Sequence, residues 1–186
     1  MIPALCEILR SYEARVAFTR AGGVRILINL IKAVGANGDA QQLYNFVFCL
    51  WTLSLPLGLV HQTECLSQLE PFLQCGALHS LCGLVAAPPS KKVLRVTLAT
   101  LRNISLTEHE IILNEMLNHG LLKTIDNMVA TGVIKQHGDC DIEQDARALF
   151  ELMNRNFKEL SSFQKWVSEV QSGYLRWSVG NPHKIM

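Results

Sequence analysis

The feature that most constrains the fold is a glycine-led apolar pattern that occurs three times in the chain. Gly22, Gly76 and Gly120 are each followed by apolar residues two, five, eight and nine positions later. This spacing is typical of one face of an α-helix, and glycine suits a tight turn before such a helix. A longer apolar helical pattern follows each segment, and equivalent leucines in the three long patterns are 51 and 48 residues apart. Helical repeats of this length predict an all-α fold, a right-handed α-solenoid of armadillo/HEAT-like repeats.

The second long pattern, residues 92–106, indicates which residues of such a helix would meet a partner. Its leucines follow one face at helical spacing, whereas Arg95 and Arg102 lie on a different face. Armadillo proteins bind through the long helix of each repeat, so we predict that Arg95, Arg102 and Asn103 contact a partner. A solvated face is the alternative for the arginines. Core packing is the preferred interpretation of Trp51, the other candidate on a long helix.

Composition and charge exclude several classes of protein. The 186 residues carry a formal net charge of +1, which argues against a nucleic-acid binder that depends on a strongly basic surface. The stretch 40–63 has no charged residue and is long enough to be weighed as a membrane span. Pro56 and Gly58 interrupt it, and it coincides with the first long helical pattern. We therefore expect a buried solenoid helix there and no direct membrane insertion.

The sequence contains no recognisable enzyme motif: no phosphate-binding loop, no G-x-G-x-x-G and no G-x-S-x-G. Residues 137–141, His-Gly-Asp-Cys-Asp, offer metal-ligand side chains, but their spacing matches no known site. Asp141 is better placed as the N-cap of the last long helix, with Gln144 three residues later. We expect no catalytic residue, no cofactor and no metal. The six cysteines are expected to be reduced, with Cys49 and Cys82 in the core.

The pattern also predicts how the chain is divided. Residues 1–160 are expected to form part of an armadillo-like helical repeat domain, whose last long helix ends near Leu160. A new helix is expected to begin at Ser161 and to end at Gly173. Residues 161–186 are predicted to be an interdomain linker at the start of a missing C-terminal domain.

Three stretches resemble a known family. Residues 48–54, F-C-L-W-T-L-S, and residues 93–103, V-L-R-V-T-L-A-T-L-R-N, resemble two helices of the regulatory H subunit of the vacuolar-type proton ATPase. Residues 159–178 are similar to the stretch that joins the two helical domains of that family, including its L-S-S-F, E-V and W-S elements. The first two patterns alone indicate armadillo repeats, and the third points to the family. The chain departs from it at Val179, where the family has proline, and at Trp166, where it usually has tyrosine.

The resemblance implies a non-catalytic regulatory subunit that couples ATP hydrolysis to proton transport and so serves vacuolar acidification. It implies a cytoplasmic protein, peripheral on the cytosolic face of vacuolar and other endomembranes. The implied partners are the E and G subunits of the peripheral stalk, the cytosolic domain of the a subunit, and the catalytic sector, without nucleic acid. The candidate partner-binding residues are Arg95, Arg102, Asn103, Trp166 and Trp177.

The alternative is a general armadillo-repeat adaptor or scaffold protein, such as a cargo receptor of the importin-alpha kind. That class uses a tryptophan followed four residues later by asparagine on successive long helices. Here Trp51 is followed by Leu55, and Asn103 is preceded by Ala99. The array is therefore missing, and binding of nuclear signals is not expected. An enzyme is the third and least supported class.

Overall fold

The computed structural model describes residues 2–35, 38–55, 69–132, 134 and 138–171. Within these ranges the regular elements are helices and no strand occurs, so the predicted all-α fold is confirmed. The helices are α1 (Ile2–Ile8), α2 (Tyr12–Arg20), α3 (Gly23–Val34), α4 (Ala40–Ser54), α6 (Ala77–Ala86), α7 (Lys91–Ser105), α8 (Glu110–Asn118), α9 (Leu121–Ala130) and α11 (Cys140–Gln171).

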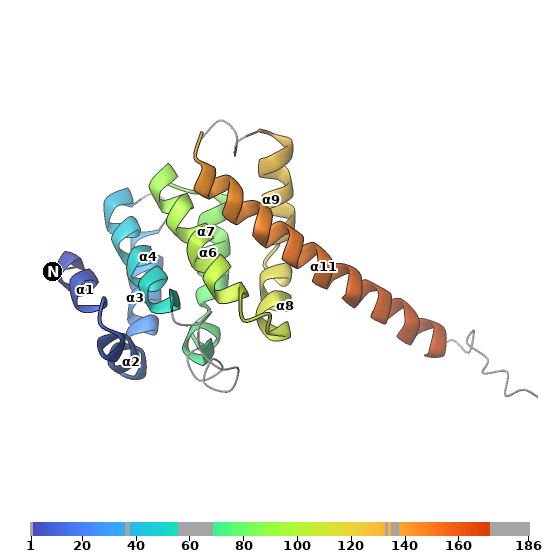
Figure 1. Ribbon diagram of the computed structural model, residues 1–186, viewed down its shortest axis with the longest axis horizontal. Helices are drawn as coiled ribbons and strands as arrows, with labels where there is room; N and C mark the ends of the chain where they lie inside the picture. The colour runs from blue at the N-terminus through green and yellow to red at the C-terminus, as the bar shows by residue number, and fades with distance from the viewer. Residues whose placement is uncertain (1, 36–37, 56–68, 133, 135–137, 172–186) are drawn as a thin grey trace, which may run out of the picture.

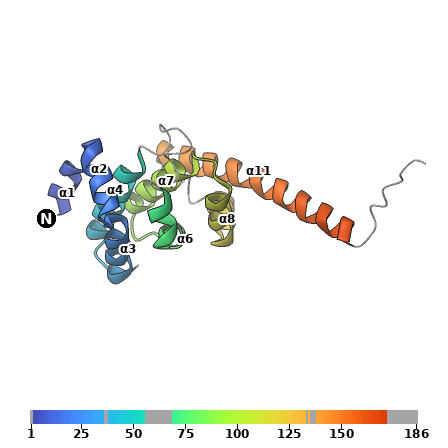
Figure 2. The ribbon, with the colours of Figure 1, turned by 90° about the horizontal axis from the view of Figure 1, so that it is seen from below.

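The helices repeat as triplets of a short, a middle and a long helix. The first triplet is α2, α3 and α4, the second is the helical segment 69–74 with α6 and α7, and the third is α8, α9 and α11. The long helices α4, α7 and α11 lie side by side, and the middle helices α3, α6 and α9 form a second layer (Figures 1 and 2). Helix α1 packs against α4. This stacking of triplets is the solenoid that the glycine-led pattern predicts.

Each middle helix begins after a glycine in the left-handed conformation. The φ angles of Gly22, Gly76 and Gly120 are 82°, 69° and 72°. A residue with a Cβ atom is strained at such angles, so the backbone turn itself requires glycine. Space is not the reason, because a Cβ atom at Gly22 or Gly120 would meet no neighbouring atom within 4 Å.

The three long helices begin in a common way. Asp39, Ser90 and Asp139 precede α4, α7 and α11, and their side chains accept hydrogen bonds from backbone N–H groups two or three residues later, at 2.9, 3.3 and 3.2 Å. These three residues are therefore N-caps, each satisfying a donor that the first helical turn leaves free. The prediction that Asp141 caps the last helix is wrong by two residues, because the N–H of Asp141 is the group that Asp139 caps.

The apolar face predicted for α7 lies in the core. All three leucines of α7 are fully buried. Thr97 and Thr100 are buried beside them, and their hydroxyls donate to carbonyl oxygens four residues earlier, each at 2.7 Å. Both polar groups are thus satisfied inside the helix. Two residues of the predicted apolar faces of α3 and α9 are exposed to solvent, Leu30 by 37% and Val129 by 55%. Each lies about 100° around its helix from a buried neighbour.

Helix α11 is the longest element, with 32 residues, and Figure 1 shows it extending beyond the other helices. It crosses the predicted boundary after Leu160 without a break, so the expected new helix at Ser161 is wrong. The hydroxyl of Ser161 donates to the carbonyl oxygen of Lys158 at 3.0 Å, as a serine inside a helix does. The assignment of 161–186 to a linker stays a prediction, and residues 172–186 lie outside the described residues.

No helix in the described ranges is long and apolar enough to cross a membrane. The first long helix, α4, has most of its apolar residues buried against the rest of the solenoid, as predicted for this segment. The remainder of the uncharged stretch, residues 56–63, lies outside the described residues.

Candidate functional site

A groove of about 460 Å³ runs along the layer of long helices and is lined only by residues of α4, α7 and α11. We call it the long-helix groove. Its lining residues are Gln41, Tyr44, Phe48, Trp51, Lys92, Arg95, Val96, Ala99, Arg102, Asp141, Gln144 and Asp145.

The α4 side of the long-helix groove is an aromatic wall made of Tyr44, Phe48 and Trp51. These residues are four and three positions apart, so they share one face of the helix. Their ring centroids are 5.9 Å apart for Tyr44 and Phe48 and 5.2 Å apart for Phe48 and Trp51, with tilted planes. All three are half-buried and pack against the core as well as lining the groove. Core packing of Trp51 and exposure to the groove therefore coexist.

The α7 side carries positive charge around a small residue. Lys92, Arg95 and Arg102 line the groove with Ala99 between them, and the short side chain of Ala99 leaves room above the helix. Lys92 is exposed and forms no ion pair with any described residue. Arg95 keeps 55% of its side chain in solvent. Lys92 is available to a negatively charged group that enters the groove, whereas Arg95 is accessible to solvent but also pairs with two aspartates.

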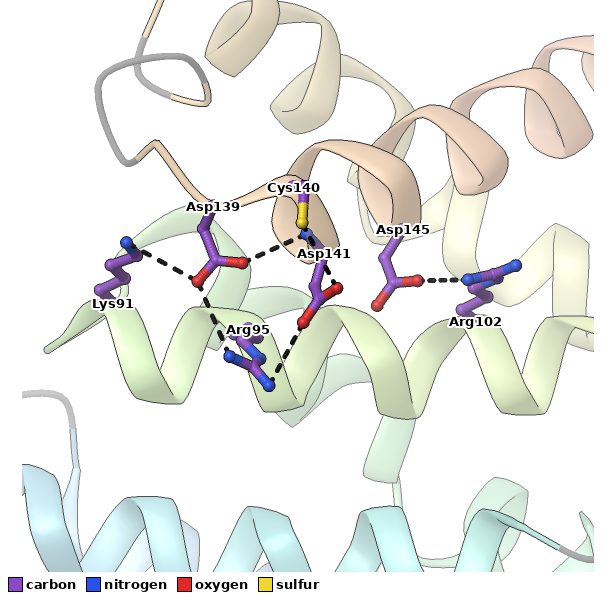
Figure 3. Close-up of polar contacts among 7 residues, drawn as sticks. All are labelled: Lys91, Arg95, Arg102, Asp139, Cys140, Asp141 and Asp145. Atoms are coloured by element: carbon purple, nitrogen blue, oxygen red, sulfur yellow. Dashed lines mark hydrogen bonds and ion pairs between the residues drawn. The ribbon is translucent and has the colours of Figure 1, made fainter.

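Basic residues of α7 also bind acidic residues at the start of α11 (Figure 3). Arg102 donates to Asp145 with 2.6 Å between nitrogen and oxygen, and Arg95 lies 3.2 Å from Asp141. Asp139, the N-cap of α11, lies 3.6 Å from Lys91 and 3.9 Å from Arg95. We call this set the α7–α11 charge cluster. It comprises Lys91, Arg95, Arg102, Asp139, Asp141 and Asp145.

Asp145 is the buried member of the charge cluster, with 7% of its surface exposed. Burial raises the pKa of its carboxyl group above the ordinary value, and the hydrogen bond and charge of Arg102 oppose that shift. Among the described residues, the carboxylate of Asp145 therefore depends on one close donor, Arg102. Arg102 holds α7 and α11 together through this contact as well as lining the groove.

The structure distributes the predicted partner-binding residues over different places. Arg95 and Arg102 line the long-helix groove, but both also pair within the chain. Asn103 lies beyond the groove lining, and its side-chain amide donates to the hydroxyl of buried Ser54 at 3.0 Å, which joins α7 to the end of α4. Trp166 belongs to the part of α11 whose side chains lie outside the described residues. Trp177 lies entirely outside the described residues.

Sequence reasoning missed Tyr44 and Phe48 on the α4 wall of the groove, and the roles of Asp139 and Asp145 in the α7–α11 charge cluster. The aromatic spacing on α4 was a usable signal, because aromatic residues recur there at helical spacing. The acidic residues gave no such signal. Their importance depends on which basic side chains α7 brings opposite them.

The groove is lined by aromatic, basic and acidic side chains. In the described part of the chain, no three histidine, cysteine, aspartate or glutamate side chains lie together so as to hold a metal ion. The segment 137–141 contains residue types that can bind a metal, and its His137 lies outside the described residues. Asp139 and Asp141 from that segment are engaged by basic side chains of α7.

The fold and the groove together define an armadillo-like helical-repeat protein with an open groove along its long helices. The family model that describes the V-ATPase H subunit matches residues 1–153. The chain therefore belongs to the V-ATPase H subunit family, and the resemblance inferred from its sequence is confirmed.

Curated relatives agree with this assignment. The V-type proton ATPase H subunit of Dictyostelium discoideum is 26% identical over 176 residues, covering 94% of this chain and 36% of the relative. A probable V-type proton ATPase H subunit of Caenorhabditis elegans is 29% identical, covering 91% of this chain and 34% of the relative. The probable H subunit of Oryza sativa is also 29% identical, covering 94% and 35%. The chain thus spans about a third of the length of these relatives.

Proposed function

We propose that this chain forms part of the N-terminal domain of a non-catalytic regulatory subunit of the vacuolar-type proton ATPase. Its role is to bind other subunits and so help to couple ATP hydrolysis to proton transport at the cytosolic face of vacuolar and other endomembranes. Membership of the V-ATPase H subunit family supports the proposal that this chain works in that ATPase complex. The observation that carries the binding role is the long-helix groove, which combines an aromatic wall with accessible positive charge.

The proposed partners are the E and G subunits of the peripheral stalk and the cytosolic domain of the a subunit, with the catalytic sector reached through them. An amphipathic helix suits a groove of this kind, since apolar side chains three or four positions apart fit against a row of aromatic rings. Tyr44, Phe48 and Trp51 provide that row. Acidic side chains on the same partner helix would meet Lys92 and Arg95 on the α7 side.

Binding of the purified chain to the E–G heterodimer and to the cytosolic domain of the a subunit tests this proposal. Isothermal titration calorimetry at moderate salt gives the affinity for each. The variant Lys92→Glu reverses an exposed charge in the groove, and we expect affinity for at least one partner to fall roughly three- to tenfold. Arg95→Ala should act in the same direction.

Lys123→Glu is the matched control, because Lys123 is an exposed lysine of α9 that does not line the long-helix groove. Its affinity should equal that of the parent chain. Equal losses for Lys92→Glu and Lys123→Glu would show that net charge, and not the groove, governs binding. A folded chain that binds neither partner would overturn the proposal and favour the general armadillo adaptor.

A further inference from the structure

We propose that Cys6 and Cys49 form an oxidation site, at which a peroxide converts two thiols in contact into a disulfide that ties α1 to α4. The two sulfur atoms lie 3.4 Å apart, although the residues are 43 positions apart in the chain. Cys6 belongs to α1 and Cys49 to α4, and these helices pack against each other. Neither residue belongs to the long-helix groove.

The geometry requires a small movement for the bond to form. A disulfide has its sulfur atoms about 2.05 Å apart, so the observed separation has to shorten by about 1.4 Å. Rotation of both side chains about their Cα–Cβ bonds can share that movement between two helices that are already packed. In the described part of the chain no other cysteine sulfur contacts a second sulfur; the remaining cysteines described are Cys75, Cys82 and Cys140.

The two cysteines differ in access to solvent, and this assigns their order of reaction. Cys6 is half-buried, whereas Cys49 is fully buried, as the sequence predicted. Burial, together with the neighbouring Cys6 thiol, raises the pKa of Cys49, so Cys49 stays protonated and attacks hydrogen peroxide poorly. Cys6 is the sulfur that peroxide reaches first.

The chemistry balances with hydrogen peroxide as the oxidant. The thiolate of Cys6 attacks one oxygen of the peroxide, the O–O bond breaks, and a sulfenic acid forms while the other oxygen leaves as water after taking up a proton. The sulfur of Cys49 then attacks the sulfur of Cys6, and the S–S bond replaces the S–O bond. The displaced hydroxide takes the proton of Cys49 and leaves as water. The sum is two thiols and one peroxide to one disulfide and two waters.

The bond would fix the first helix of the described chain to the helix that carries the aromatic wall. Cys49 follows Phe48 directly and precedes Trp51 by two positions, so its side chain anchors the buried side of the same helical turn. Oxidation would therefore hold α4 against α1 from behind the groove.

Peptide mapping of the full chain tests the assignment. The reduced protein is treated with a few equivalents of hydrogen peroxide, unfolded, alkylated, and digested with trypsin and a glutamate-specific protease. Cleavage after Glu7, Lys32 and Glu64 places Cys6 in the peptide 1–7 and Cys49, free of other cysteines, in the peptide 33–64. We expect these two peptides to appear joined, two hydrogens lighter than their sum, and to separate on treatment with dithiothreitol.

Cys6→Ser should abolish the joined pair, and Cys140→Ser, which removes an exposed cysteine, should leave it unchanged. A thermal melt of Cys6→Ser checks that the half-buried serine leaves the fold intact. A second arm oxidises the chain in urea, where the pairing should spread over the other cysteines. Sulfinic acid at Cys6 with Cys49 still alkylated in the folded chain would overturn the proposal, as would the same yield of the joined pair in urea.

Discussion

Arg102 of α7 and Asp145 of α11 form the shortest ion pair among the described residues, with 2.6 Å between Nη1 and Oδ1. The two members are unequally exposed: Arg102 keeps 36% of its side-chain surface in solvent, and Asp145 keeps 10%. Water can replace the aspartate around the arginine, but it cannot readily replace the arginine around the aspartate. The pair therefore stabilises the packing of α7 on α11 mainly by satisfying Asp145.

Replacing Arg102 by alanine should lower the free energy of unfolding by about 2 to 3 kcal/mol, because it leaves a buried carboxylate without its donor. Urea unfolding followed by circular dichroism measures the loss. Arg147→Ala is the control, because Arg147 pairs with Glu143 at 2.8 Å on the exposed surface of α11. That variant should lose less than about 0.5 kcal/mol. Similar losses for the two variants would show that burial of Asp145 has no consequence.

The raised pKa of Asp145 predicts a dependence of stability on pH. Because burial raises the pKa in the folded state, the folded protein binds this proton more tightly than the unfolded chain does. The contribution of Asp145 to the free energy of unfolding should then decrease as pH rises above about 3.9, the pKa of an unfolded aspartate. It should level off once the raised pKa of the folded state is passed.

The variant Asp145→Asn isolates this contribution, since it cannot titrate at that position. We expect the difference in free energy of unfolding, parent minus variant, to be larger near pH 3 than near pH 6. Urea titrations at several pH values give the curve. A difference that grows with pH would mean that the Arg102 contact outweighs burial in setting the pKa.

The start of α11 provides a prediction that separates two neighbouring aspartates. Asp139→Ala removes the N-cap and two ion-pair contacts, and should cost about 1 to 2 kcal/mol of stability. Asp141→Ala removes a partly exposed contact with Arg95 and should cost less than about 0.5 kcal/mol. Chemical denaturation of both variants decides between them. The reverse order would restore Asp141 as the residue that caps the helix.

Two glycines with different backbone conformations should respond to alanine with opposite signs. Gly120 has φ of 72°, so Gly120→Ala should lower the free energy of unfolding by about 1 to 2 kcal/mol through strain alone. Gly83 lies inside α6 with open space around it, so Gly83→Ala should raise stability by about 0.5 to 1 kcal/mol. Thermal melts of the two variants give the signs. Stabilisation by both substitutions would contradict the turn assigned to Gly120.

The repeat architecture was predictable because its signals are local. The glycine at each turn and the apolar spacing after it lie within about three helical turns of one another, and both reflect backbone geometry. The residue at which a helix starts was harder to predict, with an error of two residues at α11. Asp139 and Asp141 are both competent caps by type, and only the structure shows that Asp139 accepts the hydrogen bond.

The uninterrupted course of α11 was missed for a physical reason. Serine at Ser161 suits a helix N-cap, which favours a break in the prediction, yet no glycine or proline occurs between Cys140 and Gln171 to end the helix. The hydroxyl of Ser161 instead bonds back to its own helix.

The groove was predictable only in part. The exposed face of α7 with Arg95 and Arg102 followed from helical periodicity. The pairing of these arginines with aspartates of α11 could not be predicted in this way. Arg102 and Asp145 are 43 residues apart and meet only because the two helices pack together. The aromatic wall on α4 could have been found from its spacing alone.

Because α11 is the longest of the described helices, a small tilt at its packed start produces a large displacement at its far end. Met153 is the last of its described side chains to be buried, and Asn154, Phe157 and Ser161 still line a pocket with residues of α8 and α9. Figure 1 shows the C-terminal part of α11 extending beyond the other helices. Residues 162–171 form an arm of about 15 Å at 1.5 Å per residue. A tilt of about 10° about the packed base would carry the tip of such an arm through about 3 Å. A partner that tilted α11 at the α7–α11 charge cluster would therefore move a point far from the long-helix groove.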